Sequence, residues 1–150
     1  MREILFKAKQ VDNGEWIEGS LIDLDIDSGY GYIVQPYKKA SILPIIFLIT
    51  DRMKLVDPET LCQFTGLYDK NGKKIWENDI VNHNGEYATV KFGTYCSSFD
   101  CESYNLGFYV DFPEETFYRK ELGYWRRKAE IAGNVFDNPE LLQEKSDEQR

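Results

Sequence analysis

The stretch Phe64-Thr-Gly-Leu-Tyr-Asp-Lys-Asn-Gly-Lys-Lys-Ile-Trp-Glu-Asn-Asp-Ile-Val81 decides the fold of this chain. Asn71-Gly72 predicts a β-hairpin with a type I′ turn, because both residue types tolerate the positive φ angles that this turn needs. We therefore expect strand ends on both sides, with Lys70, Lys73 and Lys74 gathered at the solvated turn.

A second turn is predicted at Glu77-Asn78-Asp79, directly before the β-branched strand start Ile80-Val81. A carboxylate in this position can accept backbone N–H bonds and fix the turn, which is the role we expect for Asp79. A catalytic role for Asp79 is the alternative, but no second acid, base or metal ligand stands at a recognisable spacing. The constraints in this stretch are therefore architectural.

The same stretch, from Thr65 to Val81, resembles the central signature of the YopX family of bacteriophage and prophage proteins. Two further blocks resemble that family: Ile4–Ala8 followed by Trp16 and Gly19, and Ile131-Ala-Gly-Asn-Val-Phe-Asp-Asn-Pro-Glu-Leu-Leu142. Asn78 stands where the family usually has Gly, and Asn is the best substitute if the backbone there is left-handed. The resemblance implies a largely β phage protein of uncharacterised function, and it supplies no catalytic residues.

Length and composition are those of a folded chain with its own core. The chain has 150 residues, 42% hydrophobic and 15% aromatic, a size that suits one domain or two small lobes. The net charge of −8 argues against general nucleic-acid binding and leaves room for a basic protein partner. We expect no signal peptide and no membrane span, and hence a cytoplasmic protein of the host cell.

Metal and thiol chemistry find weak support in the sequence. Cys62, Cys96 and Cys101 are expected to be free thiols, and with His83 as the single histidine a zinc site is poorly supplied. Asp23, Asp25 and Asp27 imitate the first ligands of a calcium loop, but the loop lacks the required Gly and the final Glu. We expect these three carboxylates to face water, and we predict no cofactor.

The remaining pattern predicts a mainly β protein. It is expected to consist of two closely packed small β lobes, 1–57 and 58–142, with a polar tail at 143–150 and the join at Asp57-Pro58. The second lobe suits an SH3-like barrel with a short C-terminal helix. The predicted strands are 4–8, 16–22, 29–35, 45–50, 87–92, 106–112 and 131–136, with a long loop at 93–105 and a helix start at 137–142.

One segment departs from the acidic character of the chain. Between Thr116 and Lys128 five cations accompany four aromatic residues and the single acid Glu121. Three interpretations stay open: aromatic residues that fill the core, a protein-binding surface, and a groove for single-stranded nucleic acid. The residues predicted to bind are Arg119, Lys120, Tyr124, Trp125, Arg126 and Arg127.

These observations favour a phage-encoded, non-catalytic module that binds a protein, with self-association as one form of that binding. The alternative is an accessory protein that associates with nucleic acid through a small β-barrel. An enzyme would need a pocket where Asp79, His83 or the acids at 23–27 converge, and the sequence gives no reason to expect one. His83, next to the second Asn-Gly pair at 84–85, is expected to be an exposed side chain.

Overall fold

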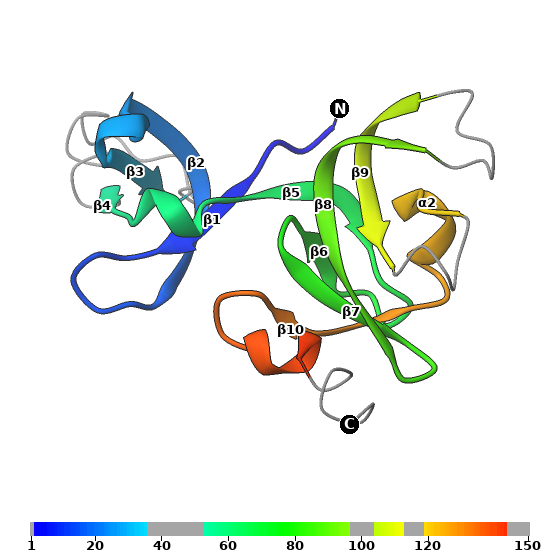
Figure 1. The fold of residues 1–150 in the computed structure, drawn as a ribbon. Coiled ribbons are helices and arrows are strands. Elements are labelled where there is room, and N and C mark those ends of the chain that lie inside the picture. Colours follow the sequence, from blue (N-terminus) through cyan, green and yellow to red (C-terminus); the bar gives the residue numbers. More distant parts are fainter. Residues whose placement is uncertain (1, 36–52, 97–103, 113–118, 144–150) are drawn as a thin grey trace. The chain divides into compact units, whose positions relative to one another are not determined.

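A computed structural model describes residues 2–35, 53–96, 104–112 and 119–143 (Figure 1). The chain forms two compact units, Met1–Phe64 and Thr65–Arg150, and the division falls within a strand a few residues beyond the predicted join at Asp57-Pro58. The first unit contains β1 (Phe6–Lys9), β2 (Trp16–Asp25), the 3-10 helix η1 (Ile26–Ser28), β3 (Tyr30–Val34), β4 (Met53–Leu55), η2 (Pro58–Thr60) and the start of β5 (Cys62–Tyr68). The second continues with β6 (Lys74–Trp76), β7 (Asp79–His83), β8 (Glu86–Cys96), β9 (Tyr104–Asp111), α2 (Leu122–Trp125), β10 (Glu130–Asn134) and η3 (Pro139–Leu142).

The first unit is an antiparallel sheet in the order β4-β3-β2-β1-β5. The predicted opening hairpin is confirmed, since Ala8 pairs with Ile17 and Gly14 adopts a φ of 71° in the turn. Gly19 is required by packing, because a Cβ atom there would collide with the carbonyl oxygen of Val34 on the neighbouring strand β3. The core of this unit is small and consists of Ala8, Ile17, Ile33 and Val56.

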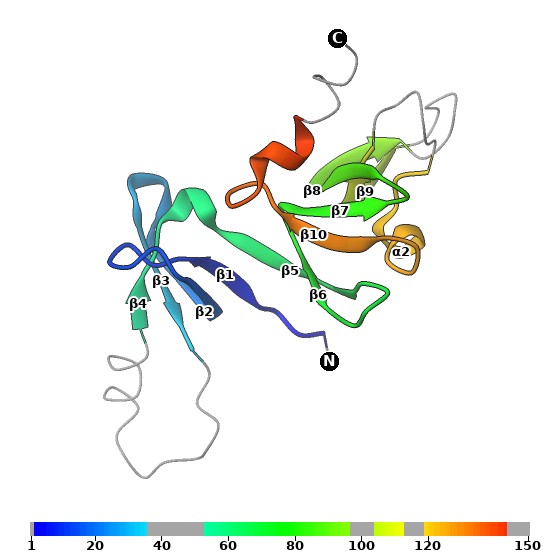
Figure 2. The ribbon, with the colours of Figure 1, turned by 90° about the horizontal axis from the view of Figure 1, so that it is seen from below.

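The second unit contains an antiparallel sheet in the order β10-β7-β8-β9 (Figure 2). The strands β5 and β6 pair with each other and belong to the other sheet. In β8 the alternate residues Ala88 and Val90 belong to the core. Helix α2 adds Leu122 and Trp125 to the same core. The buried cluster is larger than that of the first unit and comprises Ile75, Val81, Ala88, Val90, Val110, Phe112, Leu122, Trp125 and Ala129.

The Asn71-Gly72 turn is confirmed as a turn, but its predicted type is wrong. Gly72 has a φ of 82°, whereas Asn71 is not among the residues with positive φ. The N–H of Gly72 donates to the carbonyl of Asp69 at 3.1 Å, and the N–H of Asp69 donates to the carbonyl of Lys73 at 2.8 Å. This pattern is a three-residue loop that closes with a glycine bulge, and it leaves only Gly72 left-handed.

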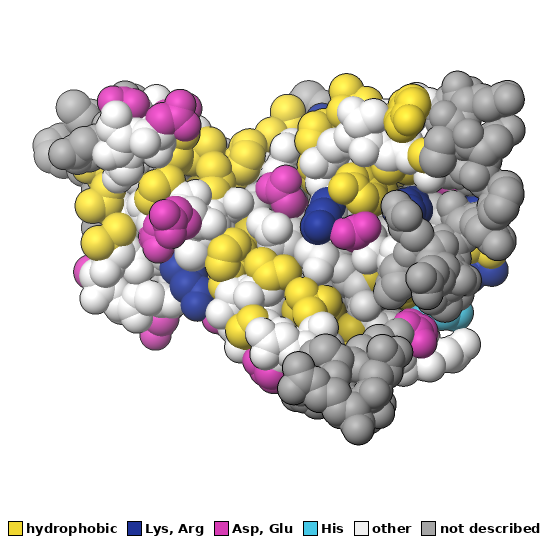
Figure 3. All heavy atoms as spheres, in the orientation of Figure 1, with side chains coloured by type: hydrophobic (Ala, Val, Ile, Leu, Met, Phe, Trp, Pro, Cys, Tyr) yellow, Lys and Arg dark blue, Asp and Glu magenta, His cyan; other side chains and the backbone are white. Residues whose placement is uncertain are grey.

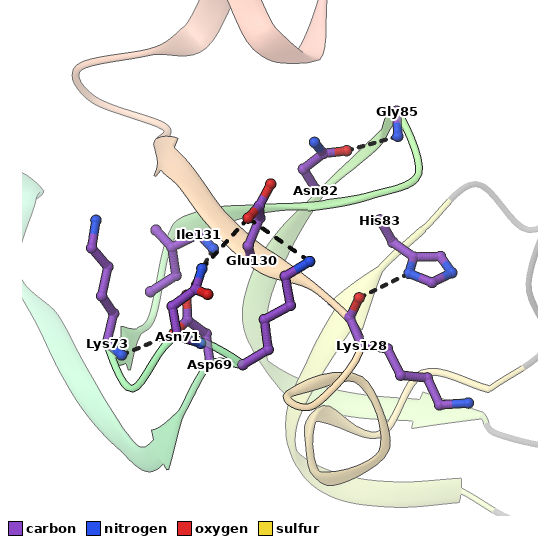
Figure 4. A network of polar contacts seen from close by, with 10 residues as sticks. Asp69, Asn71, Lys73, Asn82, His83, Gly85, Lys128, Glu130 and Ile131 are labelled. Carbon is purple, nitrogen blue, oxygen red and sulfur yellow. Dashed lines mark hydrogen bonds and ion pairs between the residues drawn. The ribbon is translucent and has the colours of Figure 1, made fainter.

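The side chain of Asp69 selects that loop. Its Oδ1 atom accepts the N–H groups of Asn71 and Lys73, both at 2.9 Å, and its Oδ2 atom accepts the N–H of Ile131 on β10 at 3.1 Å (Figure 4). Asp69 is only 6% exposed, so these bonds replace most of the hydration that its carboxylate loses on folding. A single carboxylate therefore ties the loop to a strand 62 residues later in the sequence.

The predicted role of Asp79 is confirmed. Its Oδ2 atom accepts the N–H of Trp76 at 2.8 Å, and the residue is 3% exposed. Asn78 has a φ of 70°, so the position where the family usually has Gly is indeed left-handed. The carbonyl of Asn78 also accepts the N–H of Val135 at 3.0 Å. The turn is therefore held both locally and from the C-terminal part of the unit.

One prediction for the second half of the chain needs correction. The long loop at 93–105 is shorter than expected, because β8 extends to Cys96 and β9 begins at Tyr104, with Cys96 opposite Tyr104. Cross-strand pairing decides here, since a Ser-, Tyr- and Cys-rich composition without clear periodicity hides a two-stranded ribbon. The helix α2 was not predicted, whereas the short helix expected near the C-terminus is present as the 3-10 helix η3.

The mainly β fold class is confirmed: two antiparallel sheets account for most of the described chain, with a single short α-helix. The predicted strand at 45–50 and the polar tail beyond residue 143 lie outside the described residues. Asp23, Asp25 and Asp27 are exposed, as expected. Across the described ranges, none of the helices has both the length and the apolar character that a bilayer crossing demands.

Candidate functional site

The cationic and aromatic residues predicted to bind are gathered around α2 and the turn after it. The chain reaches α2 from Lys120, whose carbonyl accepts the N–H of Val110 on β9 at 2.8 Å. After α2 the N–H groups of Lys128 and Ala129 both donate to the carbonyl of Trp125 at 2.9 Å. This four-residue helix is therefore held at both ends, and it presents a fixed set of side chains.

Trp125 belongs to the core and not to the surface. It is 4% exposed, and its indole N–H donates to the carbonyl of Arg119 at 2.8 Å. Its ring lies 4.7 Å from that of Phe112 and 5.1 Å from that of Tyr124, measured between centroids. Trp125 was predicted to bind a partner, but its buried side chain is not accessible to one. A large apolar side chain on a short helix is stabilised by packing against the sheet.

Tyr124 is the centre of the cluster that remains. The guanidinium carbon of Arg119 lies 4.5 Å from the centroid of its ring, and the ammonium of Lys128 lies 4.3 Å from it. Lys128 also donates a hydrogen bond to the phenol oxygen at 3.0 Å. That bond and the positive charge of Lys128 lower the pKa of the Tyr124 phenol below its ordinary value, and Arg119 contributes less. We call Arg119, Tyr124, Arg126, Arg127 and Lys128 the α2 cluster.

The other predicted cations differ in how much of their charge is available. Lys120 is mostly covered, with a side chain 15% exposed and its ammonium 4.0 Å from Asp111. Arg119 lies 3.6 Å from the carboxylate of Glu121, but its side chain stays 59% exposed. Within the described ranges no ion pair is recorded for Arg126 or Arg127. The outward charge of the cluster therefore comes from Arg119, Arg126, Arg127 and Lys128.

His83 holds the turn that follows α2 against β7. Its Nδ1 atom lies 3.0 Å from the carbonyl oxygen of Lys128 (Figure 4). Its ring also packs edge-on against that of Trp125, with 5.0 Å between the centroids. A carbonyl can only accept, so Nδ1 carries the proton, and Nε2 then accepts from the Asn84 amide at 3.4 Å. The expectation of an exposed side chain is wrong, because the ring is half-buried.

Asp69 is the important residue that sequence reasoning missed. The signal was present, since an Asp two residues before Asn-Gly commonly accepts backbone N–H bonds from the turn. What the sequence could not show is the third bond, to Ile131. In the described residues, three or more possible metal ligands do not come together anywhere. Cys62 and Cys96 take part in no disulfide bond, and Cys101 lies outside the described residues.

The fold and the site together define a mainly β protein of two compact units with a cationic and aromatic cluster on the second. A family model described as "YopX protein" matches residues 5–143, nearly the whole chain, and the chain belongs to this family.

A crystal structure of protein EF1440 from Enterococcus faecalis is similar in fold, with a TM-score of 0.52 and 19% sequence identity. The match covers 95% of this chain and 99% of that one. No curated protein matches the sequence.

The structure shows how two of the sequence blocks that resemble the family are connected. Asp69 in the central block bonds Ile131, the first residue of the C-terminal block, and Asn78 bonds Val135 in the same two blocks. Gly133 is needed because a Cβ atom there would collide with the side chain of Asn138, whose oxygen accepts the N–H of Asn134. The central and C-terminal signature blocks thus contact each other through backbone-directed bonds.

Proposed function

We propose that this protein is a non-catalytic binding module of phage or prophage origin, and that the α2 cluster contacts an acidic segment of a partner protein in the host cytoplasm. The observation that carries the proposal is the pair of cations held on Tyr124, with Arg126 and Arg127 beside them. An aromatic ring with flanking guanidinium groups is the composition that dominates protein-binding hot spots. Acidic side chains of a partner would bring the charge that these cations attract.

A non-catalytic role is supported by how the candidate chemical groups are used. The carboxylates of Asp69 and Asp79 accept backbone N–H bonds in buried positions. His83 bonds a backbone carbonyl and an asparagine side chain. Groups engaged in this way fix local structure and would have to break those bonds to move a proton for a substrate.

A nucleic-acid groove is the weaker alternative. Single-stranded nucleic acid binds by stacking bases on successive exposed aromatic rings. Trp125, the largest ring of the segment, is buried, which leaves Tyr124 as the described ring in the cluster. A net charge of −8 also works against a polyanion over most of the surface.

The test is a capture experiment from host cells with three immobilised proteins: wild type, Arg126→Glu/Arg127→Glu, and the control Lys54→Glu/Lys73→Glu. The control reverses two exposed cations outside the cluster and changes the net charge by the same amount. A specific partner should be retained by wild type and control and lost by the cluster variant. Equal recovery by all three proteins would contradict the choice of surface, and loss of a partner only after nuclease treatment would favour the nucleic-acid alternative.

The pKa of the Tyr124 phenol offers a second way to detect the same contact. Because cations lower the pKa of its phenol, an acidic partner that neutralises Lys128 and Arg119 should raise that pKa toward the ordinary value. The difference between ultraviolet titrations of wild type and Tyr124→Phe, with and without the captured partner, isolates this phenolate from the other tyrosines among the ten in the chain. A partner that leaves the titration of Tyr124 unaltered while binding fully would place the contact elsewhere.

A further inference from the structure

Asparagine followed by glycine is prone to a chemical change that needs no enzyme: the glycine nitrogen attacks the asparagine side chain, and ammonia leaves. Glycine favours this reaction because it has no Cβ atom to restrict the backbone while the new ring closes. The chain has three such pairs, Asn13-Gly14, Asn71-Gly72 and Asn84-Gly85. All six residues are exposed, so access of water does not distinguish the three pairs.

Asn84-Gly85 differs from the other pairs in what its amide nitrogen contacts. Nδ2 of Asn84, the atom that has to leave, lies 3.4 Å from Nε2 of His83. Nδ1 of His83 donates to the carbonyl of Lys128 at 3.0 Å, which holds the ring with Nε2 toward Asn84 (Figure 4). Figure 3 shows part of the only histidine side chain of this chain, coloured cyan, at the surface, where the ring can exchange protons with water.

The other two pairs have different contacts. Nδ2 of Asn71 lies 3.5 Å from Oε2 of Glu130, a carboxylate that accepts a hydrogen bond and has no proton to supply. At Asn13 the side-chain oxygen is engaged instead, since it accepts the N–H of Glu15 at 2.9 Å. Among the contacts of the described residues, a group that can protonate a leaving amide nitrogen is therefore found at the third pair alone.

We propose that Asn84 is a self-modification site, which is converted to aspartate or isoaspartate with His83 as the proton donor to its leaving nitrogen. The nitrogen of Gly85 loses its proton to water and attacks Cγ of Asn84. A new C–N bond closes a succinimide ring while the bond from Cγ to Nδ2 breaks. Nδ2 takes a proton from Nε2 of His83 and leaves as ammonia, and His83 regains a proton from water. A second water molecule then adds to either carbonyl carbon of the ring and opens it.

The reaction consumes one water molecule and releases one ammonia molecule, and no oxidant or reductant takes part. His83 keeps its bond to Lys128 throughout, because Nε2 is the atom that donates and Nδ1 is the atom that bonds the carbonyl. The reacting groups all belong to this chain, so the inference is independent of the proposed binding function.

The test is prolonged incubation of the full chain in water enriched in a heavy oxygen isotope, followed by peptide mass spectrometry. The isotope marks carboxylates that form during the incubation and separates them from those that form during digestion. In wild type, Asn84 should convert at least about ten times faster than Asn13 or Asn71. Conversion of Asn84 no faster than that of the other two asparagines would overturn the proposal.

His83→Gln separates proton donation from loop structure. Glutamine can donate a hydrogen bond but does not give up a proton, so the conversion of Asn84 should slow to the rate of Asn13 in the same sample. Loss of a contact that only holds the loop would speed the reaction instead, because a looser backbone reaches the ring-closing geometry more often. Unchanged or faster conversion in this variant would therefore contradict the proposal.

The wild-type chain unfolded in guanidinium chloride is the reference, and it serves even if the variant folds poorly. There His83 still precedes Asn84 in the sequence but is no longer held against it. The three pairs should then convert at similar rates. An unfolded chain that keeps the preference for Asn84 would show that neighbouring sequence sets the rate, and the role of the folded contact would be wrong.

Discussion

The two Asn-Gly loops of the second unit have the same central dipeptide and different structures. At Asn84-Gly85 both residues are left-handed, with φ angles of 52° and 86°, and His83 pairs directly with Glu86. At Asn71-Gly72 only the glycine is left-handed. The Asn-Gly dipeptide is therefore compatible with either turn geometry, and a residue outside the dipeptide determines which geometry forms.

That residue stands two positions before each Asn. Asn82 offers one side-chain oxygen to the N–H of Gly85 at 2.9 Å, whereas Asp69 offers two oxygens to three N–H groups (Figure 4). One of the three belongs to β10, so the first loop is part of the core architecture and the second is a local surface hairpin. The following variants test this difference, beginning with the largest expected effect.

Asp69→Ala should be the most damaging substitution. Three backbone donors lose a charged acceptor in a position that is 6% exposed, and water can replace that acceptor only partly. We expect a loss of about 4 kcal/mol in the free energy of unfolding, measured by urea denaturation. The control Asn82→Ala removes one bond at a more exposed loop and should cost about 0.5 kcal/mol. Equal losses would contradict the distinction between the loops.

Asp69→Asn gives the first loop the same residue type that precedes the second loop, where Asn82 stands two positions before Asn84. The amide oxygen can still accept from Asn71 and Lys73, but the NH2 group then faces the N–H of Ile131, two donors without an acceptor. The cost should be about 2 kcal/mol, between wild type and Asp69→Ala. A variant as stable as wild type would show that the bond to β10 contributes little.

Replacing each loop asparagine by alanine should destabilise the two loops to different extents, because only one of these asparagines has a left-handed backbone. Asn84→Ala keeps the left-handed backbone but removes the polar side chain that lets Asn tolerate it, and should cost about 1 kcal/mol. Asn71→Ala meets no such requirement and should cost less than about 0.5 kcal/mol. Thermal unfolding of the two variants side by side measures the difference, and the reverse order would show that the assigned turn types are exchanged.

Glycine at the same positions should give changes of opposite sign. Asn84→Gly relieves the left-handed backbone and should stabilise by up to about 0.5 kcal/mol. Asn71→Gly adds only freedom to the unfolded chain and should destabilise by a similar amount. Both changes in unfolding free energy are small, so they need replicate denaturation curves. Changes of the same sign in the two variants would contradict the assignment of different backbone geometries to the two loops.

Sequence reasoning reached the fold class, the opening hairpin and the turn of Asp79, because each depends on residues close together in the chain. It failed where distant segments decide. The β8–β9 ribbon extends through Thr94 by cross-strand pairing, and Trp125 is buried by α2, a helix too short to show a periodic pattern. The sequence shows where cations and aromatic residues gather between Thr116 and Lys128, but only the structure shows which of the described side chains there are exposed and that Trp125 is buried.

The central claim is that the signature stretch builds the second unit through the carboxylate of Asp69. Backbone amide hydrogen exchange at Ile131, compared between wild type and Asp69→Asn, tests it most directly. Selective loss of protection at Ile131, with the amide of Gly85 unaffected, is the predicted result. Unchanged protection at Ile131 would contradict the account, because β10 would then be held without its bond to the loop.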